Sequence, residues 1–242
     1  MRVFVLCTGR SGSHTLAAAC RYISNYTSGH ESNRERQGKT LDERLAFPDR
    51  HIEVDHRLIW MAGTLERLYA PDVLYVHLRR DRDLTIRSFA LRIMNRGIND
   101  AFRTILDSPR DLRRRFEQSE ALVTSVEDNI KAFLAEPSRE SITIDVEQFA
   151  DGFRELCGRI EADVDLEAAL EVLKIKHSKT TARWLERNYR ADDYHDPKPT
   201  IGRSLLKRRR RRERRQRSRQ GKIDFKREGG RLRDPSEKRR RR

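Results

Sequence analysis

The chain is organised around the stretch Val3-Phe-Val-Leu-Cys-Thr-Gly-Arg-Ser-Gly-Ser-His-Thr-Leu16. Its apolar residues up to Cys7 predict a short buried strand, the small residues after them predict a turn, and a helix is expected from about Ser13. Such a turn presents the free N–H groups of a helix N-terminus, which bind anions together with the helix dipole, and Gly9 and Gly12 let the backbone approach closely. The stretch predicts either an anion site or a plain strand, turn and capped helix, because short Gly and Ser motifs are common in both.

The other polar residues of this turn are also potential anion ligands. Arg10 adds a fixed positive charge, and Ser11, Ser13 and Thr15 add hydroxyl donors. The turn is not a Walker A loop, which ends in Gly-Lys-Ser/Thr, because it contains no Lys.

Strand and helix patterns alternate along the rest of the chain. Further strands are predicted at 26–30, 51–55, 73–78 and 141–145. Helices are predicted at 13–24, 57–69, 83–95, 110–135 with an interruption near Ser119, 146–160, 166–173 and 180–188. This alternation predicts an α/β fold with a mainly parallel sheet, in which ligands bind at the carboxyl ends of the strands.

The basic residues are concentrated at the end of the chain. Residues 203–242 contain 21 Lys and Arg against 5 Asp and Glu, a formal charge of +16, and the whole chain of 242 residues carries +15, so residues 1–202 carry −1. We therefore expect one α/β domain at 1–200 and a basic tail at 201–242, disordered or partly helical, because blocks of like charge cannot form a core. Such a tail can bind a polyanion (nucleic acid, acidic glycan or anionic membrane) without sequence specificity.

Secretion and membrane insertion are not predicted. No apolar run approaches the ~20 residues that span a bilayer, and the first residues lack the pattern of a signal peptide. A cytoplasmic location is therefore expected. Cys7, Cys20 and Cys157 have apolar neighbours and no metal-ligand spacing, which indicates buried thiols.

A second group of polar residues follows the strand predicted at 73–78. Arg80 lies at the end of that strand, two residues beyond position 78, and Ser88 lies eight residues further on, in the next helix. Both side chains can converge on one anion beside the first turn. The alternative is a solvated basic turn held by ion pairs of Arg79 and Arg82 with Asp81 and Asp83.

Together, the two motifs resemble the sulfotransferase family. In that family the first loop holds the 5′-phosphosulfate of 3′-phosphoadenosine 5′-phosphosulfate (PAPS), and a later Arg and Ser hold its 3′-phosphate. The resemblance implies a P-loop NTPase-like three-layer sandwich. It assigns the first role to Arg10, Ser11, Gly12, Ser13, His14 and Thr15, and the second to Arg80 and Ser88. An Arg at position 10, where the cytosolic branch has Lys, is similar to the carbohydrate-type and bacterial members.

The resemblance also implies a reaction. A sulfuryl group would pass from PAPS to an acceptor hydroxyl on a carbohydrate, lipid or small metabolite, and PAP would be the product. The step is a loose in-line displacement like phosphoryl transfer, and no metal is required because the moving group bears a single negative charge. Arg10 would be a catalytic residue that stabilises charge on the leaving 5′-phosphate.

An acceptor hydroxyl also needs a general base, and two residues are candidates. Glu31 follows the strand predicted at 26–30, where carbohydrate-type relatives place a catalytic Glu. His56 follows the strand predicted at 51–55, close to where cytosolic relatives place a catalytic His. Arg10 favours Glu31, because it aligns the chain with the relatives that use Glu. Asp55 and Arg57 are expected either to line the cleft or to pair with neighbouring charges.

Two other functions fit parts of the sequence. A P-loop-like nucleotide or small-molecule kinase would need a Lys in the first turn, which is absent, and a Mg²⁺-binding carboxylate after a strand. A non-catalytic protein that binds nucleic acid or another polyanion would rely on residues 203–242. Phe225 is the single aromatic residue of that segment, so base stacking is not expected.

Overall fold

The fold is seen in a computed structural model of the chain, which describes residues 1–32, 40–91, 97–108 and 114–175. All of these residues belong to one structural unit, residues 1–190. The boundary predicted at residues 200/201, the helix predicted at 180–188 and the basic segment 203–242 lie outside the described residues.

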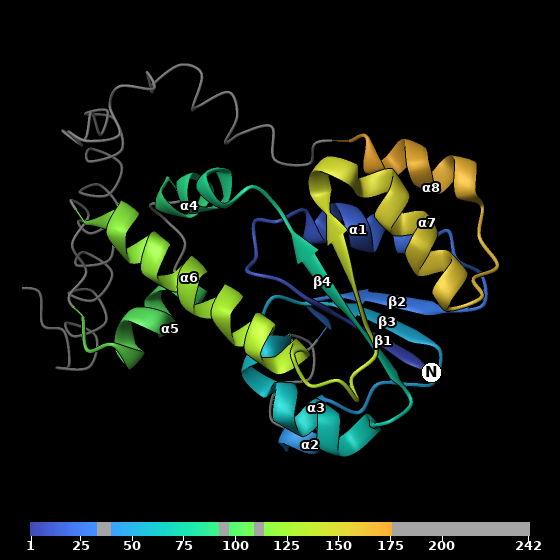
Figure 1. The fold of residues 1–242 in the computed structure, drawn as a ribbon, viewed down its shortest axis with the longest axis horizontal. Coiled ribbons are helices and arrows are strands. Elements are labelled where there is room, and N and C mark those ends of the chain that lie inside the picture. The colour runs from blue at the N-terminus through green and yellow to red at the C-terminus, as the bar shows by residue number, and fades with distance from the viewer. Residues whose placement is uncertain (33–39, 92–96, 109–113, 176–242) are drawn as a thin grey trace, which may run out of the picture. The chain divides into compact units, whose positions relative to one another are not determined.

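A parallel β-sheet forms the centre of this unit. Within the described ranges it has five strands in the order β2-β3-β1-β4-β5 (Figure 1). The strands are β1 (Arg2–Leu6), β2 (Thr27–His30), β3 (His51–Val54), β4 (Val73–Arg79) and β5 (Ser141–Asp145). Every strand pair is parallel, and Val5 of the central strand is level with Val54 of β3 and Val76 of β4. The predicted α/β fold with a parallel sheet is confirmed.

Helices cover both faces of the sheet, so the described residues form a three-layer α/β sandwich (Figure 1). On one face pack α1 (Ser13–Cys20), α7 (Phe149–Arg159) and α8 (Leu166–Leu173). On the other face pack α3 (Ala62–Tyr69) and α6 (Arg115–Leu134). The remaining elements are α2 (Leu41–Arg44), the 3₁₀ turn η2 (Leu58–Met61), α4 (Arg82–Ala90), α5 (Ile98–Ile105) and the 3₁₀ turn η3 (Val146–Gln148).

The direction of each crossover decides which face its helix covers. The chain passes from β1 over β3 to β2 through α1, and from β3 over β1 to β4 through α3. Because crossovers between parallel strands are right-handed, these opposite directions put α1 and α3 on opposite faces. The winding therefore reverses at β1, and ligands bind at the carboxyl ends of the strands around such a reversal.

Alternate residues of β1 face two separate hydrophobic cores. Val3 and Val5 pack with α1, α7 and α8, whereas Phe4 and Leu6 pack with α3 and α6. All four side chains are fully buried. Burial on both faces explains why this strand is an unbroken apolar run rather than an alternating one.

Several helix predictions need correction: the helix predicted at 13–24 ends at Cys20, and the one predicted at 146–160 begins with η3 before α7. Helix α6 is continuous, so the interruption predicted near Ser119 is wrong. Ser119 is 3% exposed and lies on the same buried face as Leu122, Val126 and Ile130, where its small side chain fits against the core. The segment predicted as one helix at 57–69 begins instead with η2 and continues as α3.

The three cysteines are free and buried, as predicted. Burial raises the pKa of the Cys7 thiol to about 11, so Cys7 is a core residue rather than a nucleophile. Within the described ranges, no helix has both the length and the apolar character needed to cross a bilayer.

Candidate functional site

The turn after β1 has an unusual backbone. Gly9, Arg10 and Gly12 all have positive φ angles, of 80°, 63° and 86°. This conformation costs glycine nothing but is disfavoured for Arg10, so the surrounding structure must hold it there. Gly12 is the N-cap of α1 and no side chain caps the helix. The N–H groups of the first helical turn are therefore available to a ligand.

The hydroxyl groups of this turn differ in their surroundings. Ser11 is 1% exposed, and its Oγ interacts with the Cys7 thiol but makes no hydrogen bond to a nitrogen or oxygen atom of the described residues. Sulfur is only a weak acceptor. Ser13 Oγ lies 3.3 Å from His30 Nε2. Thr15 is buried and His14 is exposed, with its ring 5.4 Å from that of His30.

The second motif begins where β4 ends. Arg80 follows the strand, and the next residue, Asp81, caps α4 by accepting a hydrogen bond from the backbone N–H of Leu84 at 2.7 Å. Ser88 lies in α4 and is 4% exposed. The cap fixes the start of the helix and thereby the position of Ser88, two turns further on.

The two motifs are in direct contact. Arg10 Nε donates a hydrogen bond to Ser88 Oγ at 2.9 Å, and Arg80 Nη1 donates one to the backbone oxygen of Arg10 at 2.9 Å. The structure thus brings Arg80 and Ser88 beside the first turn, as the sequence predicted. Their role in holding an anion stays a prediction.

The neighbouring arginines do not form the ion pairs proposed as the alternative. Arg79 pairs with Asp145 of β5 at 3.3 Å, and Arg82 pairs with Glu120 of α6 at 3.3 Å. Arg80 makes no ion pair with any residue that the structure describes, since its guanidinium bonds only to the Arg10 carbonyl. Its positive charge therefore has no carboxylate partner among the described residues.

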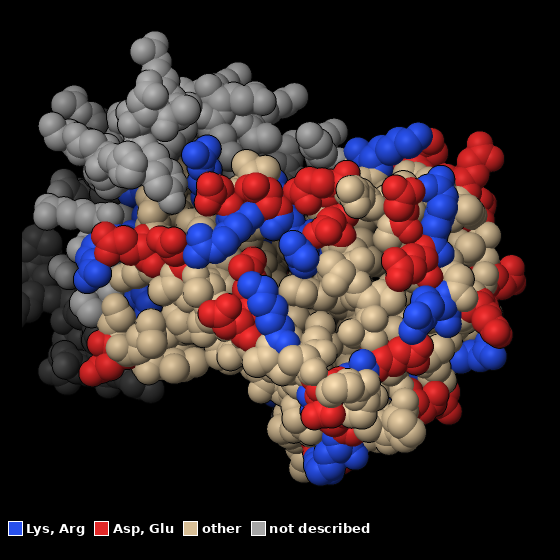
Figure 2. Space-filling model, in the orientation of Figure 1, with Lys and Arg blue, Asp and Glu red and all other residues tan. Residues whose placement is uncertain are grey.

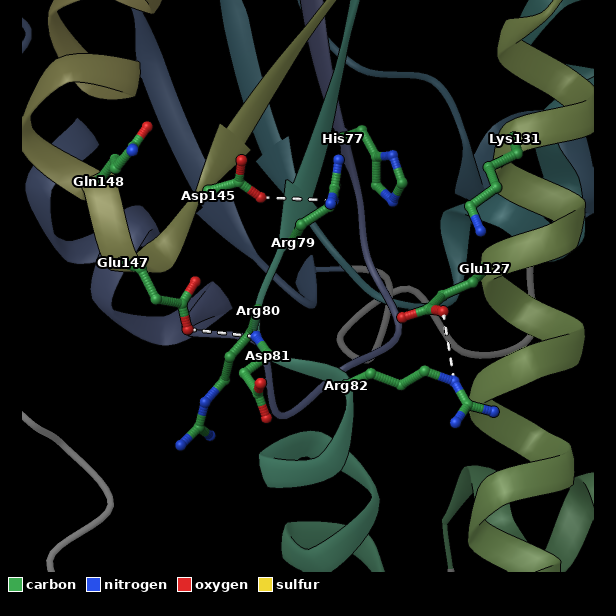
Figure 3. Close-up of a pocket in the computed structure, with 10 residues that line it drawn as sticks. All are labelled: His77, Arg79, Arg80, Asp81, Arg82, Glu127, Lys131, Asp145, Glu147 and Gln148. Atoms are coloured by element: carbon green, nitrogen blue, oxygen red, sulfur yellow. Dashed lines mark hydrogen bonds and ion pairs between the residues drawn. The ribbon is translucent and has the colours of Figure 1, made fainter.

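A cleft of about 540 Å³ opens between the carboxyl ends of β4 and β5 and helix α6 (Figure 3). It is lined by His77, Arg79, Arg80, Asp81, Arg82, Glu127, Lys131, Asp145, Glu147 and Gln148. Glu147 accepts a hydrogen bond from the backbone N–H of Asp81 at 3.1 Å, which ties the turn after β5 to the end of β4. Burial, and secondarily Arg79, lowers the pKa of His77 to about 4, so this imidazole is neutral at pH 7.

Glu31 and His56, the two candidate bases, lie next to each other. Glu31 follows β2, His56 lies two residues beyond β3, and these strands are neighbours in the sheet. Glu31 Oε1 is 3.3 Å from His56 Nδ1. The side chains are 18% and 17% exposed. What the sequence offered as alternatives is a contacting pair in the structure.

Asp55 and Arg57 pair with each other. Asp55 is fully buried, and Arg57 contacts both of its carboxylate oxygens, through Nε to Oδ1 at 2.8 Å and through Nη2 to Oδ2 at 2.6 Å. The hydrogen bond to Asp55 raises the pKa of Arg57 above its ordinary value. The pair is a charge-assisted bidentate contact, the geometry in which a buried carboxylate is best compensated.

Sequence reasoning missed Glu53, a fully buried carboxylate in the middle of β3. Its oxygens accept hydrogen bonds from Ser32 N at 2.9 Å and Ser32 Oγ at 2.7 Å, and one lies 3.1 Å from His51 Nε2. Burial alone would raise the pKa of Glu53, but the hydrogen bonds from His51 and Ser32 lower it below its ordinary value. The sequence feature that could have revealed it is a Glu within a predicted strand, because a buried charge must have partners.

On the face shown in Figure 2, Lys and Arg side chains are interspersed with Asp and Glu and do not gather by sign. The described residues contain no cluster of His, Cys, Asp or Glu suited to hold a metal ion. No protein-family model matches the chain, and no curated protein matches its sequence.

Proposed function

We propose that the chain is a PAPS-dependent sulfotransferase with a P-loop-like fold, which moves a sulfuryl group to an acceptor hydroxyl on a carbohydrate, lipid or small metabolite. The observation that carries the proposal is the contact of Arg10 with both Ser88 and Arg80. The two anion motifs lie far apart in the sequence. Their meeting at the carboxyl ends of β1 and β4 supports a donor with two anionic groups rather than two unrelated turns.

The residues present fit such a donor. The first helical turn of α1, the buried Ser11 hydroxyl and Arg10 would hold the phosphosulfate. Arg80, whose charge has no carboxylate partner among the described residues, would hold the 3′-phosphate with Ser88. The hydroxyl of Ser88 accepts a hydrogen bond from Arg10 and donates to no described residue, so its hydrogen is left for a phosphate oxygen.

The donor, when bound, supplies a sulfuryl group whose bond to the 5′-phosphate oxygen breaks as the acceptor oxygen bonds to sulfur. Arg10 lies in the turn as a permanent cation that is already oriented by Ser88, so it can stabilise developing negative charge without reorganising. A general base must take the proton of the acceptor hydroxyl. Glu31 and His56 lie at the same end of the sheet as the first turn and are the candidates.

The two rival functions have less support. A kinase would use a carboxylate at the end of a strand to hold Mg²⁺, and Asp55 occupies such a place at the end of β3. Both of its oxygens are engaged by Arg57, so it is poorly suited to that role. Polyanion binding without catalysis depends on residues 203–242 and leaves the contacts among Arg10, Ser88 and Arg80 without a use.

The proposal is tested by the thermal stability of the full-length chain with and without PAP. A ligand that binds only the folded state at about 100 times its Kd adds about 2.7 kcal/mol, which raises the Tm of a chain of this size by roughly 5–10 °C. Arg80→Ala should remove most of the shift. Arg159→Ala is the matched control, because Arg159 pairs with Glu140 just before β5, at the opposite end of the strands. No shift for the wild-type chain at saturating PAP would refute the proposal.

A further inference from the structure

We infer that Glu31 and His56 act as one unit, in which His56 accepts the proton of the acceptor hydroxyl at Nε2 and Glu31 is a positioning residue that holds the ring from the Nδ1 side. The catalytic role rests on the proposed sulfotransferase function. The pairing of the two side chains does not, because it is a property of the fold.

The surroundings of the imidazole ring decide which nitrogen carries the proton. Nδ1 of His56 lies 3.3 Å from Glu31 Oε1 and 3.7 Å from Asp55 Oδ1. Two carboxylate oxygens favour an N–H group at Nδ1, which leaves Nε2 as the basic nitrogen of the neutral ring. Nε2 makes no hydrogen bond to any residue that the structure describes. Nε2 is therefore the nitrogen at which the ring can accept a proton.

Glu31 is held in a strained conformation by its neighbours. Its φ angle is 53°, which is disfavoured for a residue with a side chain. The backbone N–H of Glu31 donates to the oxygen of Val54 at 3.2 Å, and its carbonyl accepts from Arg57 Nη2 at 3.3 Å. The next residue, Ser32, donates hydrogen bonds to the buried carboxylate of Glu53 through its backbone N–H and its hydroxyl. Bonds on both sides thus fix a backbone that turns Glu31 towards His56, and strain maintained in this way is typical of functional sites.

His56 also packs against the first turn. A Cβ atom added to Gly9 would lie 3.3 Å from Cγ of His56, closer than nearly all such contacts. The ring thus lies against the first turn as well as beside the carboxylates of Glu31 and Asp55. This places the proposed base directly beside the turn proposed to hold the sulfuryl donor.

The tautomer favours His56 over Glu31 as the base, because a neutral ring that carries its proton at Nδ1, beside Glu31 and Asp55, has its lone pair at Nε2. The O–H bond of the acceptor breaks, its electron pair stays on the oxygen that attacks, and the proton goes to Nε2. The carboxylate of Glu31 stabilises the resulting imidazolium, as a paired carboxylate does in other base–carboxylate pairs. Water then takes the proton from Nε2.

The pairing is tested by ¹⁵N NMR titration of the full-length, histidine-labelled chain with PAP present, with the His56 signals assigned by their loss in His56→Gln. Wild-type His56 should show the Nδ1–H tautomer when neutral. Glu31→Gln should shift the neutral ring towards the Nε2–H tautomer, because it removes the carboxylate nearest to Nδ1. Glu161→Gln is the control, since Glu161 also has a positive φ, of 49°, but lies in the turn after α7. An unchanged tautomer ratio in Glu31→Gln would overturn the pairing.

The catalytic role is tested by PAP formation from PAPS with water as the acceptor hydroxyl. His56→Gln should slow it by roughly 10²- to 10⁴-fold, and Glu31→Gln by at least about tenfold. Added imidazole should restore part of the rate of His56→Gly and none of the rate of Glu31→Gln. The reverse pattern, with His56→Gln fully active and Glu31→Gln inactive, would make Glu31 the base and overturn the inference.

Failure of the proposed function is distinguishable from failure of this inference. If the wild-type chain shows no PAP-induced shift in Tm, the sulfotransferase assignment fails, and the titration of His56 still decides whether the pair exists. If both single variants keep the PAP shift and the wild-type turnover rate, the sulfotransferase assignment stands and the pair has no catalytic role.

Discussion

Arg10 Nε donates a hydrogen bond to Ser88 Oγ at 2.9 Å, across 78 residues of sequence. Arg10 belongs to the turn after β1, and Ser88 to the helix that follows β4, the strand beside β1. Two motifs that each look like an ordinary turn thereby become one site. The contact also restrains Arg10, whose positive φ would otherwise be costly.

Ser88→Ala is therefore expected to weaken PAP binding by about tenfold, because it removes a hydrogen bond to a charged group that is typically worth about 1.5 kcal/mol or more. The change should lower the free energy of unfolding only slightly, since alanine fits a helix and fills nearly the same space. Isothermal titration with PAP measures the affinity. Ser138→Ala, at an exposed serine after α6, is the control and should leave PAP binding unchanged. Equal affinities for Ser88→Ala and the wild-type chain would remove Ser88 from the site.

The sequence was sufficient to predict this convergence, but not the contact between Glu31 and His56. Local patterns predict the positions of Arg80 and Ser88. A polar residue just after a buried parallel strand lies at the carboxyl edge of the sheet, and the helix that follows begins at that edge. Glu31 and His56 meet because β2 lies beside β3, and strand order is a long-range property that local patterns do not specify. Local patterns therefore present Glu31 and His56 as alternative bases rather than as a pair.

Other features depended on partners that the sequence pattern did not reveal. In the alternative interpretation of the turn after β4, Asp81 forms an ion pair, but it caps α4 because its position directly before the helix lets its carboxylate reach the Leu84 N–H. Ser119 was expected to break a helix, but it packs on the core face of α6. In each case a local propensity was outweighed by a contact that exists only in the folded chain.

The basic tail gives a prediction that can be separated from catalysis. Deleting residues 203–242 removes a formal charge of +16. Binding to heparin or duplex DNA should then fall sharply, together with its dependence on salt, because release of counterions drives such binding. The PAP-induced shift in Tm should persist, because the contacts of Arg10, Arg80 and Ser88 lie within residues 1–175. Loss of the PAP shift would show that the domain extends into the tail.

A double-mutant cycle at Glu53 and Gly29 tests the contacts of Glu53, which accepts hydrogen bonds from Ser32, the residue after Glu31. Glu53→Gln should destabilise the fold by about 2 kcal/mol, since the carboxylate accepts charge-assisted bonds in a buried place. Gly29→Ala should act on the same group, because a Cβ at Gly29 would lie 2.3 Å from Glu53 Oε2. In urea unfolding, the double variant should lose less stability than the sum of the losses in the two single variants. Full additivity would show that Gly29 does not act through Glu53.

The pH dependence of the Glu53 effect has a definite sign. The pKa of Glu53 is lowered in the folded state, where hydrogen bonds from His51 and Ser32 outweigh burial. Its contribution to stability is therefore present above the ordinary pKa of about 4.5 and is lost as the pH falls through the folded value. The stability difference between the wild-type chain and Glu53→Gln should shrink in acid, as measured by urea unfolding between pH 7 and pH 3. A difference that grows in acid would contradict the assigned charge state.

His77 should make the fold sensitive to mild acid. Burial, with Arg79 and Lys131, lowers its pKa to about 4, against a smaller opposing effect of Asp145. Between pH 6.5 and pH 4 the unfolded chain binds a proton at His77 that the folded chain does not, so stability falls as the pH falls through this window. At pH 5 the loss amounts to about 2 kcal/mol relative to pH 7 for a group this buried, taking an unfolded pKa of about 6.5.

His77→Gln removes that proton without adding a charge, so its stability should fall less between pH 7 and pH 5 than that of the wild-type chain, by about 2 kcal/mol in urea unfolding. The cleft beside α6 gives a second measurement, because His77 lies in its wall (Figure 3). An NMR titration should show the His77 ring still neutral at pH 5, where an exposed histidine is largely protonated. If both chains lose the same stability, or if the ring protonates near pH 6.5, His77 is solvated by water in the cleft and is not shielded by burial.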